Sequence, residues 1–261
     1  MSLELLVIAI LEGLTEFLPI SSTGHLIIAS RLLDVNLADP YIKFYLLVIQ
    51  FGAVLAGLLF FGKRILSDRN LILTLLISFI PSAILGFALY SVFKHLLEGN
   101  MVLLSAMLFI GGVIFIYLEK RFMRRHGEQD PEDFGSSEIS KKDAFIVGLA
   151  QAVAIVPGVS RSGATIVAGI LRGVKKSVII EYTFLLALPT LGAAVAYDAY
   201  RSRDMLAGLV SYGELVVGCV VALISAGLTL YVLKKYLLHL SLTAFGWYRI
   251  ALSLIIIVIL Y

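Results

Sequence analysis

Two short polar stretches in an otherwise apolar chain contain the residues that could carry chemistry. In the first, Glu12 and Glu16 stand four residues apart, which places two carboxylates on one face of a helix. Such a pair of like charges persists when it shares a proton, binds a divalent cation or faces an arginine. The alternative is that both carboxylates lie at a surface and are simply solvated.

The residues that follow bring hydroxyl groups and an imidazole together. Ser22 stands three residues before His25, and Ser21 and Thr23 flank the serine. A serine beside an imidazole is the minimum for an activated nucleophile or for general acid–base catalysis. The alternative is that these side chains only cap the ends of two short helices.

The second stretch combines an arginine with glycines and hydroxyl groups. Gly158 and Gly163 permit a tight turn, and the helix that follows would begin with free N–H groups and a positive dipole. Arg161 adds a planar guanidinium that matches phosphate oxygens, and the stretch therefore predicts an anion pocket. Its further donors are Ser160, Ser162, Thr165 and the upstream Gln151. The alternative is a structural salt bridge from the arginine, with Glu12, Glu16 and Glu181 as candidate partners.

Together, the two stretches suit phosphoryl transfer to water. One would supply carboxylates, a serine and an imidazole, and the other an arginine within a ring of donors. Phosphoryl transfer requires above all that charge is neutralised and that the nucleophile is positioned.

The rest of the chain places these residues in a membrane. Of its 261 residues, 60% are hydrophobic and 15% are charged, which is far from the balance of a water-soluble protein. This composition excludes a cytosolic enzyme, a secreted domain and a nucleic-acid-binding protein, and the net charge of +3 gives no reason to expect a polyanionic partner. The single cysteine excludes an intramolecular disulfide and a cysteine-based metal cluster. The chain is therefore predicted to be a polytopic membrane protein.

Six segments are long and apolar enough to cross about 30 Å of hydrocarbon as helices. They are 44–61, 71–93, 101–118, 178–198, 213–233 and 243–261. Two further apolar segments, 1–33 and 144–171, are interrupted by the polar stretches, and their arms are too short to cross alone. Broken backbone survives in a membrane only where protein or water covers it. The predicted fold is all-α, with six transmembrane helices and two re-entrant helical hairpins.

The order of these segments predicts an internal repeat. Residues 1–118 and residues 144–261 each contain one broken hairpin and three spans, and aligning the prolines of the two breaks places Ser22 on Ser160. Because three is an odd number, the second half must be inverted relative to the first. Inverted repeats bring broken helices together near the bilayer midplane.

The distribution of Lys and Arg predicts the orientation of the chain. Residues 119–143 carry both signs of charge, and we expect them to form a solvated linker loop. This linker and the loops on its side hold most of the 21 Lys and Arg, which places them in the cytoplasm. We therefore expect both termini outside, and the first hairpin open to the outer, periplasmic side of the plasma (inner) membrane.

The two polar stretches closely resemble the signature motifs of a known family. Residues 12–25 (Glu-Gly-Leu-Thr-Glu-Phe-Leu-Pro-Ile-Ser-Ser-Thr-Gly-His) and 157–165 (Pro-Gly-Val-Ser-Arg-Ser-Gly-Ala-Thr) are similar to the motifs of the undecaprenyl-diphosphate phosphatases, also called bacitracin-resistance proteins. The resemblance covers nearly the whole chain and includes 48–53, 181–189 and 247–249. It implies a membrane phosphatase that converts undecaprenyl diphosphate to undecaprenyl phosphate. Such an enzyme recycles the carrier lipid for cell-wall synthesis and confers bacitracin resistance.

The resemblance also implies roles for individual residues. Glu12 and Glu16 would be the acidic pair, with a divalent cation, Mg²⁺ or Ca²⁺, as cofactor. Arg161 would be catalytic, and we take Ser22 as the nucleophile, His25 as its proton partner and Glu16 as the group that places metal or water. Attack by the histidine or by water stays open. The residues expected to bind substrate are Ser21, Thr23, Gln151, Gly158, Ser160, Ser162, Gly163 and Thr165.

Rival functions and the oligomeric state stay open at this point. Inverted repeats with broken helices are also typical of transporters, so a transporter or flippase of a phosphate-bearing lipid is the alternative. A non-catalytic scaffold is disfavoured, because so many polar groups at membrane depth are costly. Gly111 and Gly112 could pack helices within one chain or between two copies, which leaves a homodimer open. The expected partner is a polyprenyl diphosphate lipid.

Overall fold

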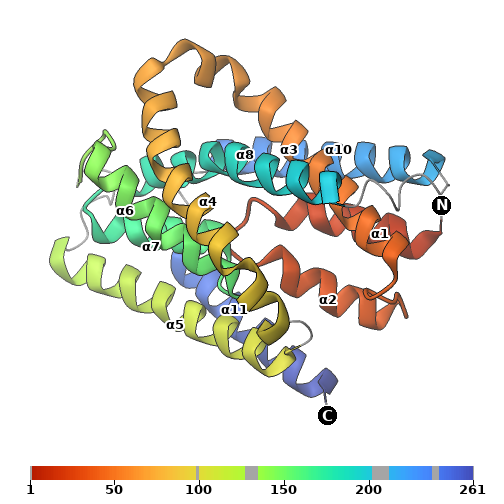
Figure 1. The fold of residues 1–261 in the computed structure, drawn as a ribbon. Helices are drawn as coiled ribbons and strands as arrows, with labels where there is room; N and C mark the ends of the chain where they lie inside the picture. The colour runs from red at the N-terminus through yellow and green to blue at the C-terminus, as the bar shows by residue number, and fades with distance from the viewer. Residues whose placement is uncertain (1, 98–99, 127–134, 202–211, 237–240, 261) are drawn as a thin grey trace.

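The computed structural model describes residues 2–97, 100–126, 135–201, 212–236 and 241–260 (Figure 1). These residues form ten α-helices and one short 3₁₀ helix, and they contain no β-strand. The helices are α1 (Leu3–Thr15), α2 (Ser22–Leu32), α3 (Pro40–Ser67), α4 (Arg69–Leu97), α5 (Met101–His126), α6 (Lys141–Ala152), η2 (Val153–Ile155), α7 (Arg161–Leu171), α8 (Lys176–Arg201), α10 (Tyr212–Tyr236) and α11 (Leu242–Leu260).

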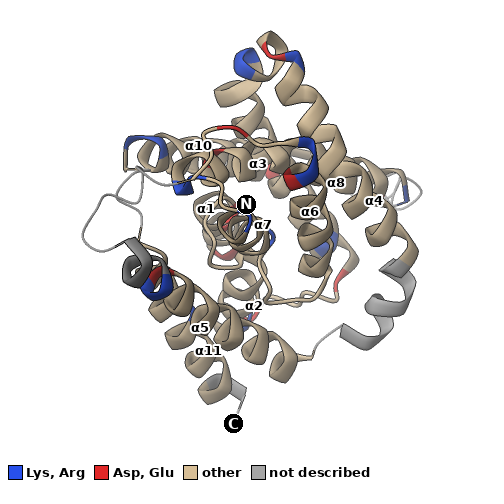
Figure 2. Ribbon diagram, turned by 90° about the vertical axis from the view of Figure 1, so that its left-hand side faces the viewer, with Lys and Arg blue, Asp and Glu red and all other residues tan. Residues whose placement is uncertain are grey.

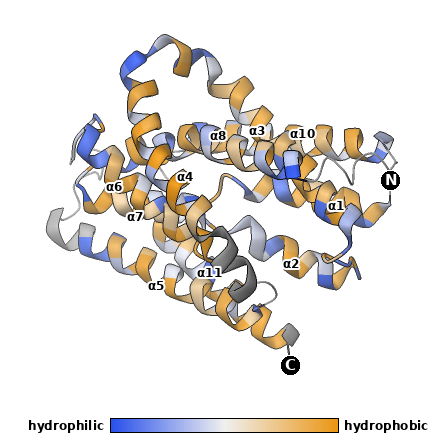
Figure 3. Cartoon of the chain, viewed as in Figure 1, coloured by the Kyte–Doolittle hydropathy of each residue, from blue (hydrophilic) through white to orange (hydrophobic). Residues whose placement is uncertain are grey.

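The long helices coincide with the six segments expected to span the membrane. α3, α4, α5, α8 and α10 are long and apolar enough to cross a bilayer, and α11 is a shorter apolar helix over Leu242–Val258. The hydrophobic colour runs along these helices in Figure 3, and large apolar side chains such as Leu59 and Ile84 are 76% and 62% exposed. A surface of this kind is suited to lipid rather than water. The chain is an integral, all-helical membrane protein.

The boundary of the expected linker 119–143 differs from the prediction, because α5 continues to His126. Glu119 holds this end of the helix against its neighbours. It pairs with Lys176 at 2.9 Å and accepts hydrogen bonds from the first backbone N–H groups of α11, including that of Thr243 at 2.6 Å. Residues 127–134 of the linker lie outside the described part of the chain.

Both predicted breaks are present. α1 ends at Thr15 and α2 begins at Ser22, while α6 ends at Ala152 and α7 begins at Arg161 after the 3₁₀ turn. Each break leaves two helical arms of 11 to 13 residues. At about 1.5 Å of rise per residue, arms of this length do not cross the hydrocarbon layer.

The two breaks end in the same local structure. Ser21 and Ser160 have φ angles of 69° and 67°, and the hydroxyl of each accepts a hydrogen bond from the backbone N–H three residues later. Such a cap satisfies one of the free N–H groups of the helix that follows. Ser160 therefore corresponds to Ser21, and the proline-based alignment with Ser22 was wrong by one residue, because the second break is one residue longer between proline and cap. Ser22 corresponds to Arg161.

Helices of the N-terminal half, 1–118, pack against helices of the C-terminal half, 144–261. α1 packs on α10 and α6 on α4, while α3 lies against α8 and α5 against α11. In Figure 2, α1 and α7 lie near the centre of the molecule, among the longer helices. Gly13 and Gly148 allow the close crossings, because a Cβ there would lie 2.5 Å and 2.1 Å from backbone oxygens of α10 and α4. The largest buried apolar cluster surrounds α8.

Candidate active site

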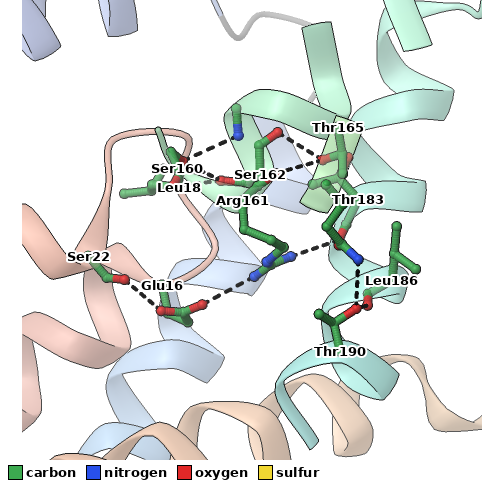
Figure 4. A network of polar contacts seen from close by, with 12 residues as sticks. Glu16, Leu18, Ser22, Ser160, Arg161, Ser162, Thr165, Thr183, Leu186 and Thr190 are labelled. Atoms are coloured by element: carbon green, nitrogen blue, oxygen red, sulfur yellow. Dashed lines mark hydrogen bonds and ion pairs between the residues drawn. The ribbon is translucent and has the colours of Figure 1, made fainter. Parts of the chain in front are cut away.

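Glu16 lies where the two breaks meet. Its Oε2 accepts a hydrogen bond from the Ser22 hydroxyl at 2.7 Å, and its Oε1 accepts one from Nη2 of Arg161 at 3.2 Å (Figure 4). Ser22 and Arg161 are the first residues of α2 and α7, so this carboxylate binds side chains from the N-terminal ends of two helices, where the helix dipole is positive. The side chain of Glu16 is 6% exposed. A hydroxyl, a carboxylate and a guanidinium from both halves of the chain thus form one buried cluster.

The guanidinium of Arg161 is only partly used by the protein. Its Nη1 donates to the backbone carbonyl of Thr183 at 3.0 Å, and its Nη2 pairs with Glu16. Its Nε is buried and has no hydrogen-bond partner among the described residues. Of the candidate salt-bridge partners, Glu16 is the one observed, while Glu181 pairs with Arg64. The arginine therefore combines a structural ion pair with a free donor.

The hydroxyls around the arginine tie the second break to its surroundings. Ser160 caps α7 and lies 3.2 Å from the hydroxyl of Ser162, which donates to the carbonyl of Leu18 in the first break at 3.0 Å. The hydroxyl oxygens of Thr165 and of Thr183 in α8 lie 2.9 Å apart. Of these hydroxyls, expected to bind substrate, Ser162 joins the two breaks, while Thr165 joins α7 to α8.

His25 does not contact the Ser22 hydroxyl. Its Nδ1 lies 2.8 Å from the carbonyl oxygen of Ser21, which can only accept, so Nδ1 carries the proton. In a neutral ring the Nε2 atom then accepts from the hydroxyl of Tyr248, 2.6 Å away. The Ser22 hydroxyl thus donates its hydrogen bond to Glu16 rather than to the histidine.

Glu12 and Gln151 occupy matching places in the two halves, each nine residues before the serine that caps the following helix. Both are buried, and each has one side-chain oxygen without a partner among the described residues. The amide nitrogen of Gln151 donates to hydroxyls of α4 and α8 at 2.8 Å and 3.0 Å. With the Nε of Arg161, three of the four unpartnered buried polar atoms found in the described residues belong to predicted site residues.

The other predicted binding residues differ in their surroundings. Thr23 is exposed. Gly158 has a φ of +90°, and a Cβ there would lie 2.5 Å from a carbonyl oxygen of α5, so this position requires glycine. A Cβ at Gly163 would lie 3.3 Å from a guanidinium nitrogen of Arg249. Both glycines therefore serve close packing of the second break.

Comparison with known proteins gives the same assignment as the motifs. Residues 5–255 match the family model described as "Bacitracin resistance protein BacA". The chain belongs to this family. Similar proteins named "Undecaprenyl-diphosphatase" include one from Campylobacter hominis, 40% identical over 96% of both chains, and one from Sulfurihydrogenibium sp., 41% identical over 97% of both. Another, from Bdellovibrio bacteriovorus, is 37% identical over 99% of this chain and 96% of the relative.

Three residues at the site were not assigned a role from the sequence. Thr183, Tyr248 and Arg249 lie inside predicted spans that the family match also covers. A polar or charged residue within a span is itself a signal, because it is costly unless it has a partner. Arg249 is the clearest missed case, since its side chain is fully buried.

Proposed function

We propose that this protein hydrolyses undecaprenyl diphosphate to undecaprenyl phosphate and inorganic phosphate. The observation that carries the proposal is the position of Glu16, which holds the Ser22 hydroxyl and the Arg161 guanidinium at once. The family and the activity named for the relatives support it. The reaction would recycle the carrier lipid of cell-wall synthesis and lower the amount of the diphosphate form, which accounts for bacitracin resistance.

The first chemical step follows from the contacts of Ser22. Its oxygen attacks the terminal phosphorus while Glu16 takes its proton. A serine O–P bond forms, the P–O bond to the lipid phosphate breaks, and its electron pair leaves on undecaprenyl phosphate. Arg161 and the N-terminus of α7 stabilise the charge on the transferred phosphoryl group. Glu16 passes this proton to the departing undecaprenyl phosphate and is again a carboxylate. Water then attacks phosphorus while Glu16 takes a proton from it, the serine O–P bond breaks, and that proton passes to the serine oxygen, which releases phosphate and restores the serine.

A divalent cation fits Glu12 better than Glu16. Both oxygens of Glu16 are already engaged, whereas Glu12 has a buried oxygen without a partner among the described residues. Those residues contain no group of three His, Cys, Asp or Glu that could hold a metal. Mg²⁺ is commonly held by one or two carboxylates together with substrate phosphates. We therefore assign Glu12 as the protein ligand of a cation, Mg²⁺ or Ca²⁺, which would neutralise diphosphate charge when bound.

We further propose that the two halves, 1–118 and 144–261, form an inverted-topology repeat with six transmembrane helices and two re-entrant hairpins. The helix contacts support it. In the repeat, α1, α2, α3, α4 and α5 correspond in order to α6, α7, α8, α10 and α11. The contact of α1 with α10 then corresponds to that of α6 with α4, while the contacts of α3 with α8 and of α5 with α11 each join two corresponding helices. The matching caps at Ser21 and Ser160 support it as well. In this arrangement both termini lie outside, and the site opens to the periplasmic side.

Phosphate release by the detergent-purified protein tests the function. Wild type should release phosphate from undecaprenyl diphosphate, and Ser22→Ala should reduce the rate by at least about 10²-fold, as expected when an activated nucleophile is lost. Ser30→Ala is the matched control, because this serine lies on the same helix and its hydroxyl is buried without a partner in the described chain. A wild-type rate no higher than that of Arg161→Ala would overturn the enzyme proposal. A fall of less than tenfold in Ser22→Ala would overturn the serine as nucleophile.

A further inference from the structure

Arg249 of α11 is a buried cation with an unusual set of partners. Its side chain has 0% exposure. Its guanidinium donates to five backbone carbonyls, and among the described residues no carboxylate pairs with it. The acceptors are Pro19 at 3.2 Å, Met107 at 3.3 Å, Leu108 at 3.4 Å, Gly158 at 2.8 Å and Val159 at 3.2 Å.

These acceptors join the two breaks through a single side chain. Nη1 binds the carbonyl three residues before Ser22, and Nη2 binds the carbonyls two and three residues before Arg161. Ser22 and Arg161 are the two residues that meet at Glu16. The other two acceptors lie in α5, so the guanidinium also fixes both breaks to a long helix.

The breaks require such a partner. Pro19, Gly158 and Val159 lie in the loops between helices, so their carbonyls have no partner within a helix, and in a membrane such groups must be satisfied by protein. An arginine offers five N–H donors in a fixed plane, whereas a lysine offers three from a single point. The guanidinium also lies 5.5 Å from the ring of Phe115, which adds a cation–π contact.

The surrounding helices leave room for this guanidinium. A Cβ at Gly111 of α5 would lie 2.2 Å from Nη2 and 2.7 Å from Cζ of Arg249. Contacts this short force the guanidinium to move. Gly111 thus offers a way to displace the arginine without removing it.

We infer that Arg249 is a positioning residue for the reaction: it sets the distance between the two breaks and so aligns Ser22 and Arg161 on Glu16. The inference rests on the proposed phosphatase function. Among the described residues, the hydrogen bonds of Arg249 go to backbone carbonyls and none goes to Ser22, Glu16 or Arg161, so it acts through the backbone of both loops. A displacement of about 1 Å in such an arrangement lowers a rate by about 10²-fold.

The test compares Arg249→Lys, Arg249→Met and Gly111→Ala in the full-length protein, with kcat, KM and the melting temperature measured for each. Gly227→Ala is the control, because a Cβ there meets nothing within 4 Å. We expect Arg249→Lys and Gly111→Ala to lower kcat by about 10²-fold with KM changed less than threefold. We expect Gly227→Ala to match wild type.

A double-mutant cycle separates positioning from loss of fold. Gly111→Ala should lower kcat much less in the Arg249→Met background than in wild type, because the group that the new methyl displaces is gone. Equal effects in both backgrounds would overturn the inference, and so would a rise in KM at constant kcat, which would assign Arg249 to substrate binding. If Arg249→Met does not fold, Gly111→Ala at an unchanged melting temperature decides alone. Failure of wild type to release phosphate would instead count against the proposed function.

Discussion

The buried ion pair between Glu16 and Arg161 makes a prediction in which stability and activity separate. Glu16→Gln keeps the size of the side chain but removes its charge, and it leaves the arginine without a counter-ion. Arg161→Gln likewise leaves the Glu16 carboxylate without a counter-ion. The double variant Glu16→Gln/Arg161→Gln removes both charges.

The magnitudes follow from the burial of the pair. The two side chains are 6% and 11% exposed, so solvent screens neither charge effectively. Removing one member of such a pair costs about 3–5 kcal/mol of stability, while replacing both members by neutral groups is close to neutral. We therefore expect each single variant to be strongly destabilised and the double variant to recover to within about 1 kcal/mol of wild type. All three should lose at least about 10²-fold in phosphate release, because base and phosphate ligand are both required.

Unfolding of the purified protein in a denaturing detergent titration measures the stabilities, and phosphate release measures the activity. Arg172→Gln is the control, because it breaks an ion pair with Asp143 in which the arginine is 37% exposed. Exposed pairs contribute about 0–1 kcal/mol, so this variant should stay near wild type in both assays. A double variant destabilised by the sum of its parts would refute the reasoning, since the two charges would then act independently.

Three shorter predictions concern other contacts. The Tyr248 hydroxyl lies 2.6 Å from Nε2 of His25, so Tyr248→Phe and His25→Ala remove the same contact, and the double variant His25→Ala/Tyr248→Phe should be no slower than His25→Ala; additive losses in kcat would show that the tyrosine acts by itself. Gly13→Ala should destabilise the protein by about 1–3 kcal/mol in detergent unfolding, because its Cβ would lie 2.1 Å from a hydroxyl oxygen of α10; a stability equal to wild type would contradict this crossing. Glu12→Gln should raise the Mg²⁺ or Ca²⁺ concentration needed for half-maximal phosphate release by at least about tenfold, and an unchanged midpoint would exclude Glu12 as the ligand.

The sequence predicts the helices and their breaks well, because local composition determines both. A run of about 20 apolar residues is stable in a bilayer as a helix. The Pro-Ile-Ser-Ser and Pro-Gly-Val-Ser segments favour a break because several glycine or hydroxyl residues follow the proline, whereas Pro81 and Pro189, each followed by one hydroxyl residue and then mainly apolar ones, lie inside helices. Arg161 was predicted as a site residue for a similar reason, since a guanidinium at a helix start between glycines is suited to an anion. These features depend on neighbours in the chain.

The partners of these residues could not be predicted in the same way. Ser22 stands closer in sequence to His25 than to Glu16, yet the positive φ of Ser21 turns the hydroxyl back toward the carboxylate. The contacts of Arg249 join segments separated by 90 to 230 residues. Such contacts depend on how α11 packs on α5, which apolar patterning leaves undetermined.

The site built across both halves also has a consequence for how the protein is made. Glu16 and Arg161 are 145 residues apart in the chain, and at about 5–20 residues per second the ribosome needs about 7–30 seconds between them. During that interval the first break has its carboxylates but lacks the guanidinium that later pairs with Glu16. The nascent N-terminal half therefore carries an incomplete site, which is completed only after the second break with Arg161 has been synthesised.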